Sequence, residues 1–456
     1  MLFKSATILR SVAALLLLIA TGVAQAAQCG NVTISSASDA DEVRKQCTAL
    51  ESLRFSNNLT ESVNLDGIET VGFVYQHDDC WGGDGEQGDC RTVPPFSISS
   101  STLTNITRGL EFGRFVGLRE LSLPNLASVE GDFRMGRMHQ LEVIDITKLV
   151  RVGSLMIEAY KLKTIRHERL DELTSTFGVG GVSLWDVGSV DSVDSFFKNP
   201  IRSNETDLPP TISLRSATMP KVRAVTIGWS RLASLSIIGD DVSVTLGGGS
   251  TDSIEIDEIK LMGNFSAFRR HPSVKNLTVG SFKLEASKTM PTEIDLPFDQ
   301  VSNISLYNNE KLQTINSTPK AVGWNLSQLS IYYNPSLSLD SENRPGLQWY
   351  WPRDHDLWWL AISDTNISNA FFTSFLGYHA ASDGRGPKVL GSFDVEPRYK
   401  QPLPFNCTPF SDLKARGVFP GHFRCLDQKA NGAALTTIHS YLAMATMLLT
   451  ALLALI

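Results

Sequence analysis

Short segments in which every second residue is apolar recur through the middle of the chain. VKNLTV, VSNISL and LSQLSI, whose fourth residues are Leu277, Ile304 and Leu329, are three of them, and others share the frame L-x-x-L-x-L. An apolar residue at every second position is the period of a β-strand. Leu277 and Ile304 are 27 residues apart, and Ile304 and Leu329 are 25 apart. A lone strand of this kind cannot bury its apolar face, so the pattern predicts a mainly β solenoid whose repeats, roughly 25 residues long, stack on one another.

Asparagine follows two of these strands, in YNNEKLQTI from Tyr307 and in YNPSLSL from Tyr333. At such a position the side-chain amide can bond the backbone where a coil turns. A β-sandwich is the alternative for alternating strands, and the shared L-x-x-L-x-L frame favours the solenoid.

The N-terminus has the pattern of an export signal. Lys4 and Arg10 charge the first segment, an apolar run from Val12 to Ala20 follows, and Ala24-Gln25-Ala26 offers small residues to a peptidase. Residues 1–26 are therefore predicted to be a signal peptide. A membrane-spanning helix is the alternative, but the run is about half the roughly 20 apolar residues that a bilayer requires.

The C-terminus has the pattern of a glycosylphosphatidylinositol (GPI) signal. Asn431-Gly432-Ala433 are small, residues 434–440 form an uncharged spacer, and residues 441–456 are apolar. The predicted attachment site is Asn431, with Gly432 as the alternative, so residues 432–456 would be removed. A retained tail anchor is the rival, but no basic residue follows the apolar tail. The predicted location is the extracellular face of the plasma membrane, with the cell wall as the alternative.

Six cysteines lie near the ends of the predicted mature chain. An even number in an exported chain predicts three disulfides. Because short loops close most easily, the favoured pairs are Cys29 with Cys47, Cys80 with Cys90 and Cys407 with Cys425. A zinc site is disfavoured because no C-x-x-C pair occurs.

Eleven Asn-x-Ser/Thr sequons are spread along the chain, and this number in an exported protein predicts many exposed loops that carry glycans. Pro409 makes the last sequon the weakest. The predicted N-glycosylation sites are Asn31, Asn58, Asn105, Asn204, Asn264, Asn276, Asn303, Asn316, Asn325, Asn366 and Asn406.

The stretch CGNVTISSASDADEVRKQC, Cys29 to Cys47, and the phrase LPNLASVEGDF, Leu123 to Phe133, resemble the fungal GPI-anchored cell-wall organisation proteins. That family is similar in its leucine-rich repeats to receptor L domains. The resemblance implies a right-handed, β-helix-like solenoid in two L-domain-like halves, residues 27–205 and 206–425. It also implies a non-enzymatic role in wall organisation and surface integrity, with wall polysaccharide or other surface glycoproteins as partners.

Two features depart from that family. Members often carry a Ser/Thr-rich stalk before the anchor, whereas the short stalk at residues 426–431 contains neither residue, which favours retention on the membrane. The segment from Cys80 to Cys90 also resembles an insertion.

No catalytic motif stands out. The chain lacks G-x-S-x-G, H-E-x-x-H and a Walker loop, and the run Gly247 to Gly249 has no following Lys, which favours a turn. No cofactor is predicted. The net charge of −7 disfavours nucleic acid and anionic lipid headgroups as ligands. A polysaccharide-modifying or polysaccharide-binding β-helix is the alternative function.

Two segments deserve separate hypotheses. HDDCWGGDGEQGDC, residues 77–90, gathers five acidic residues that could present oxygens to Ca²⁺, but its spacing does not fit an EF-hand and no metal site is predicted. LQWYWPRDHDLWW, residues 347–359, could stack its aromatic rings on sugars, with Asp354, His355 and Asp356 bonding hydroxyls. Burial of the rings as a cap of the solenoid is the favoured interpretation. The candidate glycan contacts are Trp349, Trp351, Trp358 and Trp359.

Overall fold

The computed structural model describes residues 27–76, 94–174, 180–187, 190–202, 208–215, 222–249, 251–285, 292–317, 324–339, 351–380, 386–398 and 404–428. The protein is mainly β, with 51% strand and 11% helix, and forms a parallel β-solenoid of about 11 turns. The turns fall in two compact units, Met1–Val152 with Ile165–Glu168 and Gly153–Thr164 with Arg169–Ile456. The predicted fold class is confirmed. The predicted division between residues 205 and 206 falls within the second unit and stays a prediction.

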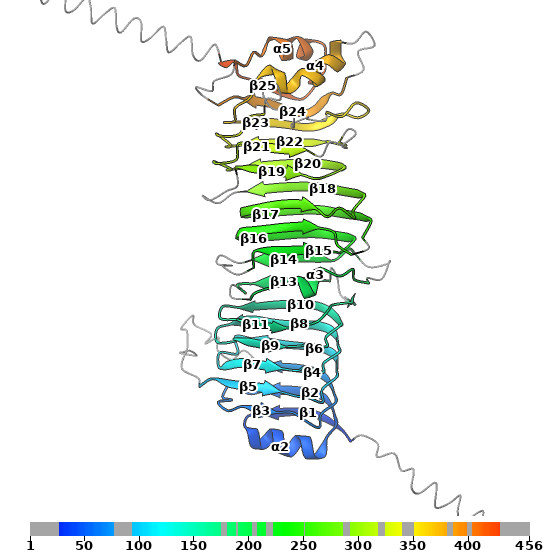
Figure 1. The fold of residues 1–456 in the computed structure, drawn as a ribbon, viewed down its shortest axis with the longest axis vertical. Helices are drawn as coiled ribbons and strands as arrows, with labels where there is room; N and C mark the ends of the chain where they lie inside the picture. Colours follow the sequence, from blue (N-terminus) through cyan, green and yellow to red (C-terminus); the bar gives the residue numbers. More distant parts are fainter. Residues whose placement is uncertain are drawn as a thin grey trace, which may run out of the picture. The chain divides into compact units, whose positions relative to one another are not determined.

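The first unit winds between two parallel sheets (Figure 1). Strands β1, β2, β4, β6 and β8 form one sheet, and β3, β5, β7 and β9 form the other. Its elements are β1 (Gln28–Ile34), α2 (Ala37–Gln46), β2 (Ala49–Phe55), β3 (Val63–Asn64), β4 (Thr70–Gln76), β5 (Phe96–Ser99), β6 (Asn105–Gly113), β7 (Leu118–Ser122), β8 (Ser128–Met138) and β9 (Val143–Asp145). Two more strands, β10 (Arg151–Ala159) and β11 (Thr164–Arg166), contain the boundaries between the two units along the sequence.

The second unit continues the same pattern along its main parallel sheet, which runs through β13, β14, β16, β17, β18, β20, β22, β23, β24 and β25. Its elements are β12 (Glu172–Leu173), β13 (Gly181–Trp185), α3 (Asp194–Phe197), β14 (Thr211–Arg215), β15 (Ala224–Ile227), β16 (Arg231–Leu246), β17 (Ser253–Arg270), β18 (Asn276–Glu285), β19 (Glu293–Leu296), β20 (Gln300–Tyr307), β21 (Thr314–Ser317), β22 (Gln328–Tyr332), β23 (Leu357–Ser363), the 3-10 helix η2 (Asn369–Phe372), α4 (Thr373–Ala380), β24 (Val389–Glu396), α5 (Thr408–Ala415) and β25 (His422–Cys425).

The in-register pairing of these strands stacks like residues on like. Ile304 on β20 lies between Phe282 on β18 and Leu329 on β22, and all three side chains are fully buried. Apolar residues at such inward positions therefore form continuous columns, while the residues between them on β20, Asn303 and Ser305, face outward.

One corner of the coils is built from a left-handed residue followed by a buried polar one. Asn308, Tyr333 and Asp364 follow β20, β22 and β23 and have φ values of 56°, 54° and 48°. The next residue along the first two coils is asparagine, Asn309 and Asn334, and both are fully buried.

These two asparagines bond each other and the turning backbone. Asn309 Nδ2 donates to Asn334 Oδ1 at 2.7 Å, and Asn334 Nδ2 donates to the carbonyl oxygens of Tyr332 at 2.8 Å and Leu306 at 3.1 Å. The corner role predicted for asparagine is confirmed. The asparagines thus add side-chain donors to buried carbonyls at the turn, where the Tyr332 carbonyl also accepts from the Asn308 amide at 3.0 Å.

The first coil of unit 1 is covered by α2 (Figure 1). The helix begins with a capping box, in which Ser36 Oγ accepts from the Asp39 amide at 3.2 Å and the Asp39 carboxylate accepts from the Ser36 amide at 3.0 Å. A third bond, from the Ser35 amide at 2.8 Å, is the main cause that lowers the pKa of Asp39. The Cys29–Cys47 disulfide ties the helix to β1, so the open end of this unit is closed covalently and by a cap.

The buried asparagine pair predicts a large stability cost for a small change. Asn334→Ala removes the acceptor of both the backbone and the side-chain amide of Asn309, together with a side-chain donor to two carbonyls, and each buried group left unpaired costs about 1–3 kcal/mol. Urea denaturation should therefore show a loss of more than about 2 kcal/mol in the free energy of unfolding. Gln328→Ala, at an exposed position of β22, is the control. A loss below about 0.5 kcal/mol, the usual effect of an exposed substitution, would contradict the role of the pair.

Candidate functional site

The aromatic segment before β23 divides into one buried and two exposed tryptophans. Trp351 is 2% exposed and stacks on Phe372 with ring centroids 5.5 Å apart, and its indole nitrogen donates to the Phe371 carbonyl at 3.2 Å. The predicted packing role is confirmed for Trp351. It is wrong for Trp358 and Trp359, which are 55% and 38% exposed. Trp349 lies outside the described residues.

A β-bulge explains why two consecutive tryptophans on a strand are both exposed. The amides of Trp358 and Trp359 both donate to the Ser327 carbonyl, at 2.8 and 3.2 Å, so two residues of β23 oppose one. A bulge interrupts the alternation that would otherwise turn one of the two inward. A second irregularity occurs on the other edge, where β23 pairs with β24 between Leu357 and Trp359.

The Trp358 ring lies against the backbone of β24 at Gly391. A Cβ atom placed on Gly391 would lie 3.1 and 3.3 Å from two carbons of the Trp358 ring and 2.7 Å from its carbonyl oxygen. Only glycine fits there. The preceding residue, Leu390, is 38% exposed, so apolar surface continues from the ring along β24.

Trp359 joins a row of outward-facing aromatic rings on β22 and β20. The hydroxyl of Tyr332 is hydrogen-bonded to the Trp359 indole, which can only donate, while burial raises the pKa of the Tyr332 phenol. Tyr332 stacks on Tyr307 with ring centroids 5.3 Å apart, and the Lys283 ammonium lies 5.4 Å from the Tyr307 centroid. We name Tyr332, Trp358, Trp359 and Leu390 together the Trp358 surface.

The charged groups beside the Trp358 surface are engaged with neighbouring groups. Arg424 on β25 lies 2.8 Å from the Glu396 carboxylate and 3.8 Å from that of Asp394. Asp356, one of the predicted hydroxyl ligands, accepts a hydrogen bond from the Lys388 amide at 2.8 Å, and His355 Nε2 lies 3.3 Å from the Leu326 carbonyl oxygen. Asp354 is exposed.

Sequence alone missed Tyr307, Tyr332 and Leu390 because their adjacency depends on the strand register.

Six of the ten described sequons lie on strands, which corrects the prediction that they mark loops. The middle residue is apolar and buried in the four sequons that begin at Asn105, Asn264, Asn276 and Asn303. The asparagine and the hydroxyl residue, two positions apart, therefore both face outward. Asn204 lies outside the described residues. The exposed asparagines are Asn31, Asn58, Asn276, Asn325 and Asn406, and the half-buried ones are Asn105, Asn264, Asn303, Asn316 and Asn366.

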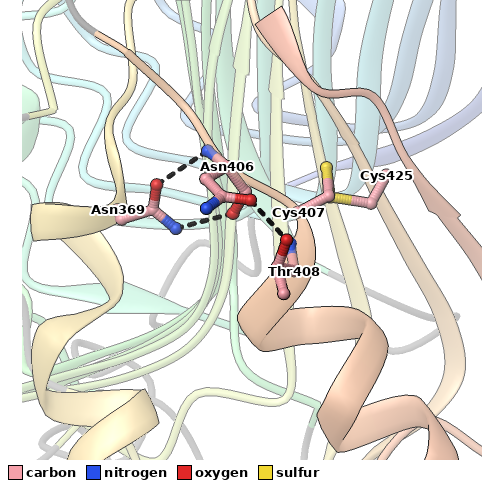
Figure 2. Close-up of a disulfide and its surroundings, with 5 residues drawn as sticks. All are labelled: Asn369, Asn406, Cys407, Thr408 and Cys425. Carbon is pink, nitrogen blue, oxygen red and sulfur yellow. Dashed lines mark hydrogen bonds between the residues drawn. A yellow bond between two sulfur atoms is a disulfide. The ribbon is translucent and has the colours of Figure 1, made fainter. Parts of the chain in front are cut away.

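Figure 2 shows how the last sequon is held beside the C-terminal disulfide. The Asn369 side chain bonds both backbone groups of Asn406 at 2.8 Å, and the Thr408 amide donates to Asn406 Oδ1 at 2.9 Å. Cys407 is bonded to Cys425. The predicted pairs Cys29–Cys47 and Cys407–Cys425 are confirmed, whereas Cys80 and Cys90 lie outside the described residues.

Several other predictions cannot be placed, because the signal peptide, the acidic segment at 77–90, Asn431 and Gly432 lie outside the described residues. Within the described ranges, no group of three or more His, Cys, Asp or Glu side chains is arranged to hold a metal ion. No helix in that same part of the chain has the length and apolarity needed to cross a membrane.

Comparisons with known proteins identify no relative: no family model, curated protein or solved structure matches the chain. The site must therefore be interpreted from its own geometry.

The amide of Asn366 predicts one empty sequon. Its Nδ2 donates to the Pro335 carbonyl at 3.1 Å and its Oδ1 is buried, so the folded chain has no room for a glycan on this nitrogen. Glycopeptide mass spectrometry of the secreted protein should find Asn366 unmodified and the exposed Asn276 occupied. A glycan on Asn366 in folded, secreted protein would contradict the geometry.

His379 near the end of α4 predicts a pH-dependent stability. Burial is the main cause that lowers its pKa from 6.5, and the nearby Arg416 charge acts in the same direction, against the hydrogen bond to the Pro387 carbonyl. Its Nδ1 is buried without a partner in the described part of the chain. Since the folded state binds the proton more weakly than the unfolded state, this contribution is present above the unfolded pKa and is lost as the pH falls.

The melting temperature of the wild type should fall more steeply than that of His379→Gln between about pH 7.5 and about pH 5. His379→Gln keeps every carboxylate that titrates in the same range, so the difference between the two curves reports His379 alone. Parallel curves for the two proteins would show that His379 does not carry the effect.

Proposed function

We propose that this protein is a non-enzymatic, GPI-anchored surface glycoprotein that takes part in cell-wall organisation. The observation that carries the proposal is the outward position of the sequons on the strands. A glycan attached to Asn105, Asn276 or Asn303 can extend into solvent without disturbing the column of buried residues, because the apolar middle residue of each sequon stays in the core.

The disulfides support the same compartment. Cys29–Cys47 and Cys407–Cys425 are both formed, and no free cysteine occurs in the described ranges. Structural disulfides persist in oxidising surroundings such as the secretory pathway and the cell exterior. The wall role itself rests on the resemblance of residues 29–47 and 123–133 to wall-organisation proteins.

A polysaccharide-binding role is the second candidate, and the exposed Trp358 and Trp359 favour it. The ion pairs of Arg424 with Asp394 and Glu396 favour binding over hydrolysis, since both carboxylates of that group are already engaged. A hydrolase needs a carboxyl group free to act as acid or nucleophile.

The anchor can be tested on intact cells. Phosphatidylinositol-specific phospholipase should release the protein into the medium, because residues 432–456 would have been exchanged for a lipid that the enzyme cleaves. A version truncated after Asn431 should be secreted without treatment and serves as the control. Detection of the 441–456 peptide in the mature membrane-bound protein by mass spectrometry would contradict the anchor.

A further inference from the structure

The repeated coils provide an internal comparison for the position of Trp358. The same bulge, in which two successive amides donate to one carbonyl of the preceding coil, occurs at Glu69 and Thr70 on Thr48, and at Lys275 and Asn276 on Asp252. Equivalent residues are thus Glu69 and Lys275, both exposed, and the same pair of bonds, from Val150 and Arg151 to the Ala127 carbonyl, places Val150 there at 39% exposure. This corner of the coil folds with a charged side chain, so an exposed indole at Trp358 is not required by the fold.

The size of the Trp358 surface argues against a protein partner. A whole aromatic side chain offers roughly 150–250 Å². Exposed fractions of 55% for Trp358 and 38% for both Trp359 and Leu390 therefore leave on the order of 300 Å² of apolar surface. A specific protein interface buries roughly 800 Å² on each side, whereas an apolar patch of about 300 Å² on a monomer is often functional.

The charges and shapes around the patch select the ligand class. The neighbouring carboxylates of Asp394 and Glu396 share one cation, Arg424, so this group keeps a net negative charge, which disfavours an anionic ligand. The Trp358 indole packs against Gly391, and the residue remains 55% exposed. A pyranose ring with equatorial hydroxyls presents C–H groups on its faces and polar groups only at its rim, which matches a flat aromatic ring bordered by polar side chains.

We propose that the Trp358 surface binds a neutral, β-linked polysaccharide of glucose or N-acetylglucosamine. Trp358 stacks on one sugar ring, and the Tyr332–Trp359 pair contacts the chain beyond it. No sequon lies on β22, β23, β24 or β25, so none of the protein's own glycans is attached within the surface. The inference rests on the proposed position of the protein at the cell surface, where such polymers are present.

The test uses the full chain produced in a eukaryotic secretory host. Affinity electrophoresis with a soluble β-1,3-glucan, with chitin oligosaccharides and with α-mannan measures binding. The wild type should bind at least one of the two β-linked probes and bind mannan, whose 2-hydroxyl is axial, more weakly. Trp358→Ala should lower the affinity about tenfold or more, since anchors of this kind carry most of the binding energy, and should leave the melting temperature unchanged. Tyr160→Ala, which removes another exposed aromatic side chain, is the matched control and should bind normally.

Several outcomes would overturn the proposal. They are a wild type that binds neither β-linked probe, a Trp358→Ala protein that binds like the wild type, and a sedimentation shift from dimer to monomer in the variant. Trp358→Lys is a second variant, chosen because the equivalent position holds Lys275 and the coil folds there with a lysine. It should be secreted and should also lose binding. Failure of both variants to be secreted would show that Trp358 is structural. Phospholipase release of the wild type does not depend on any of these results, so the anchor and the binding site can fail separately.

Discussion

Every feature of the two units depends on parallel, in-register hydrogen bonding from one coil to the next. In-register pairing places apolar residues of successive coils above one another, so Phe282, Ile304 and Leu329 form one buried column. Their neighbours along each strand form outward rows. The same hydrogen bonding continues into the corners, where the Asn308 amide donates to the Tyr332 carbonyl at 3.0 Å and the Tyr333 amide to the Ser363 carbonyl at 3.2 Å. The buried pair Asn309 and Asn334 adds side-chain hydrogen bonds there, to each other and to the carbonyls of Leu306 and Tyr332. Core, corner and surface therefore have one cause.

The outward rows are where the chain is free to vary without disturbing its fold. On several strands they hold glycosylation sequons, whose apolar middle residues remain in the core. On β20, β22 and β23 they hold aromatic rings, from Tyr307 through Tyr332 to Trp359, with Trp358 at the bulge beside Gly391 of β24. The outward positions thus carry sequons in some places and aromatic rings in others, and β20 carries both, Asn303 and Tyr307.

The repeat, the corner asparagines and both described disulfides were predictable, because each depends on spacing along the chain or on the short-range period of a strand. The placement of the sequons in loops was wrong because a sequon with an apolar middle residue is itself an alternating strand pattern. Burial of Trp358 was predicted wrongly because the bulge at Ser327 cannot be recognised without its partner strand. The Tyr332–Trp359 contact joins residues whose relative position depends on the register between β22 and β23.

The register between coils is the central claim, and a pair of introduced cysteines tests it most directly. Glu258 on β17 and Ser281 on β18 are paired in register, and neighbouring strands lie about 4.8 Å apart, within the reach of a disulfide. Glu258→Cys with Ser281→Cys should form a disulfide in the secreted protein. Glu258→Cys with Lys283→Cys, displaced by two residues along the partner strand, should not. Efficient bonding of the displaced pair, with none in the first, would contradict the register and with it the surface derived from it.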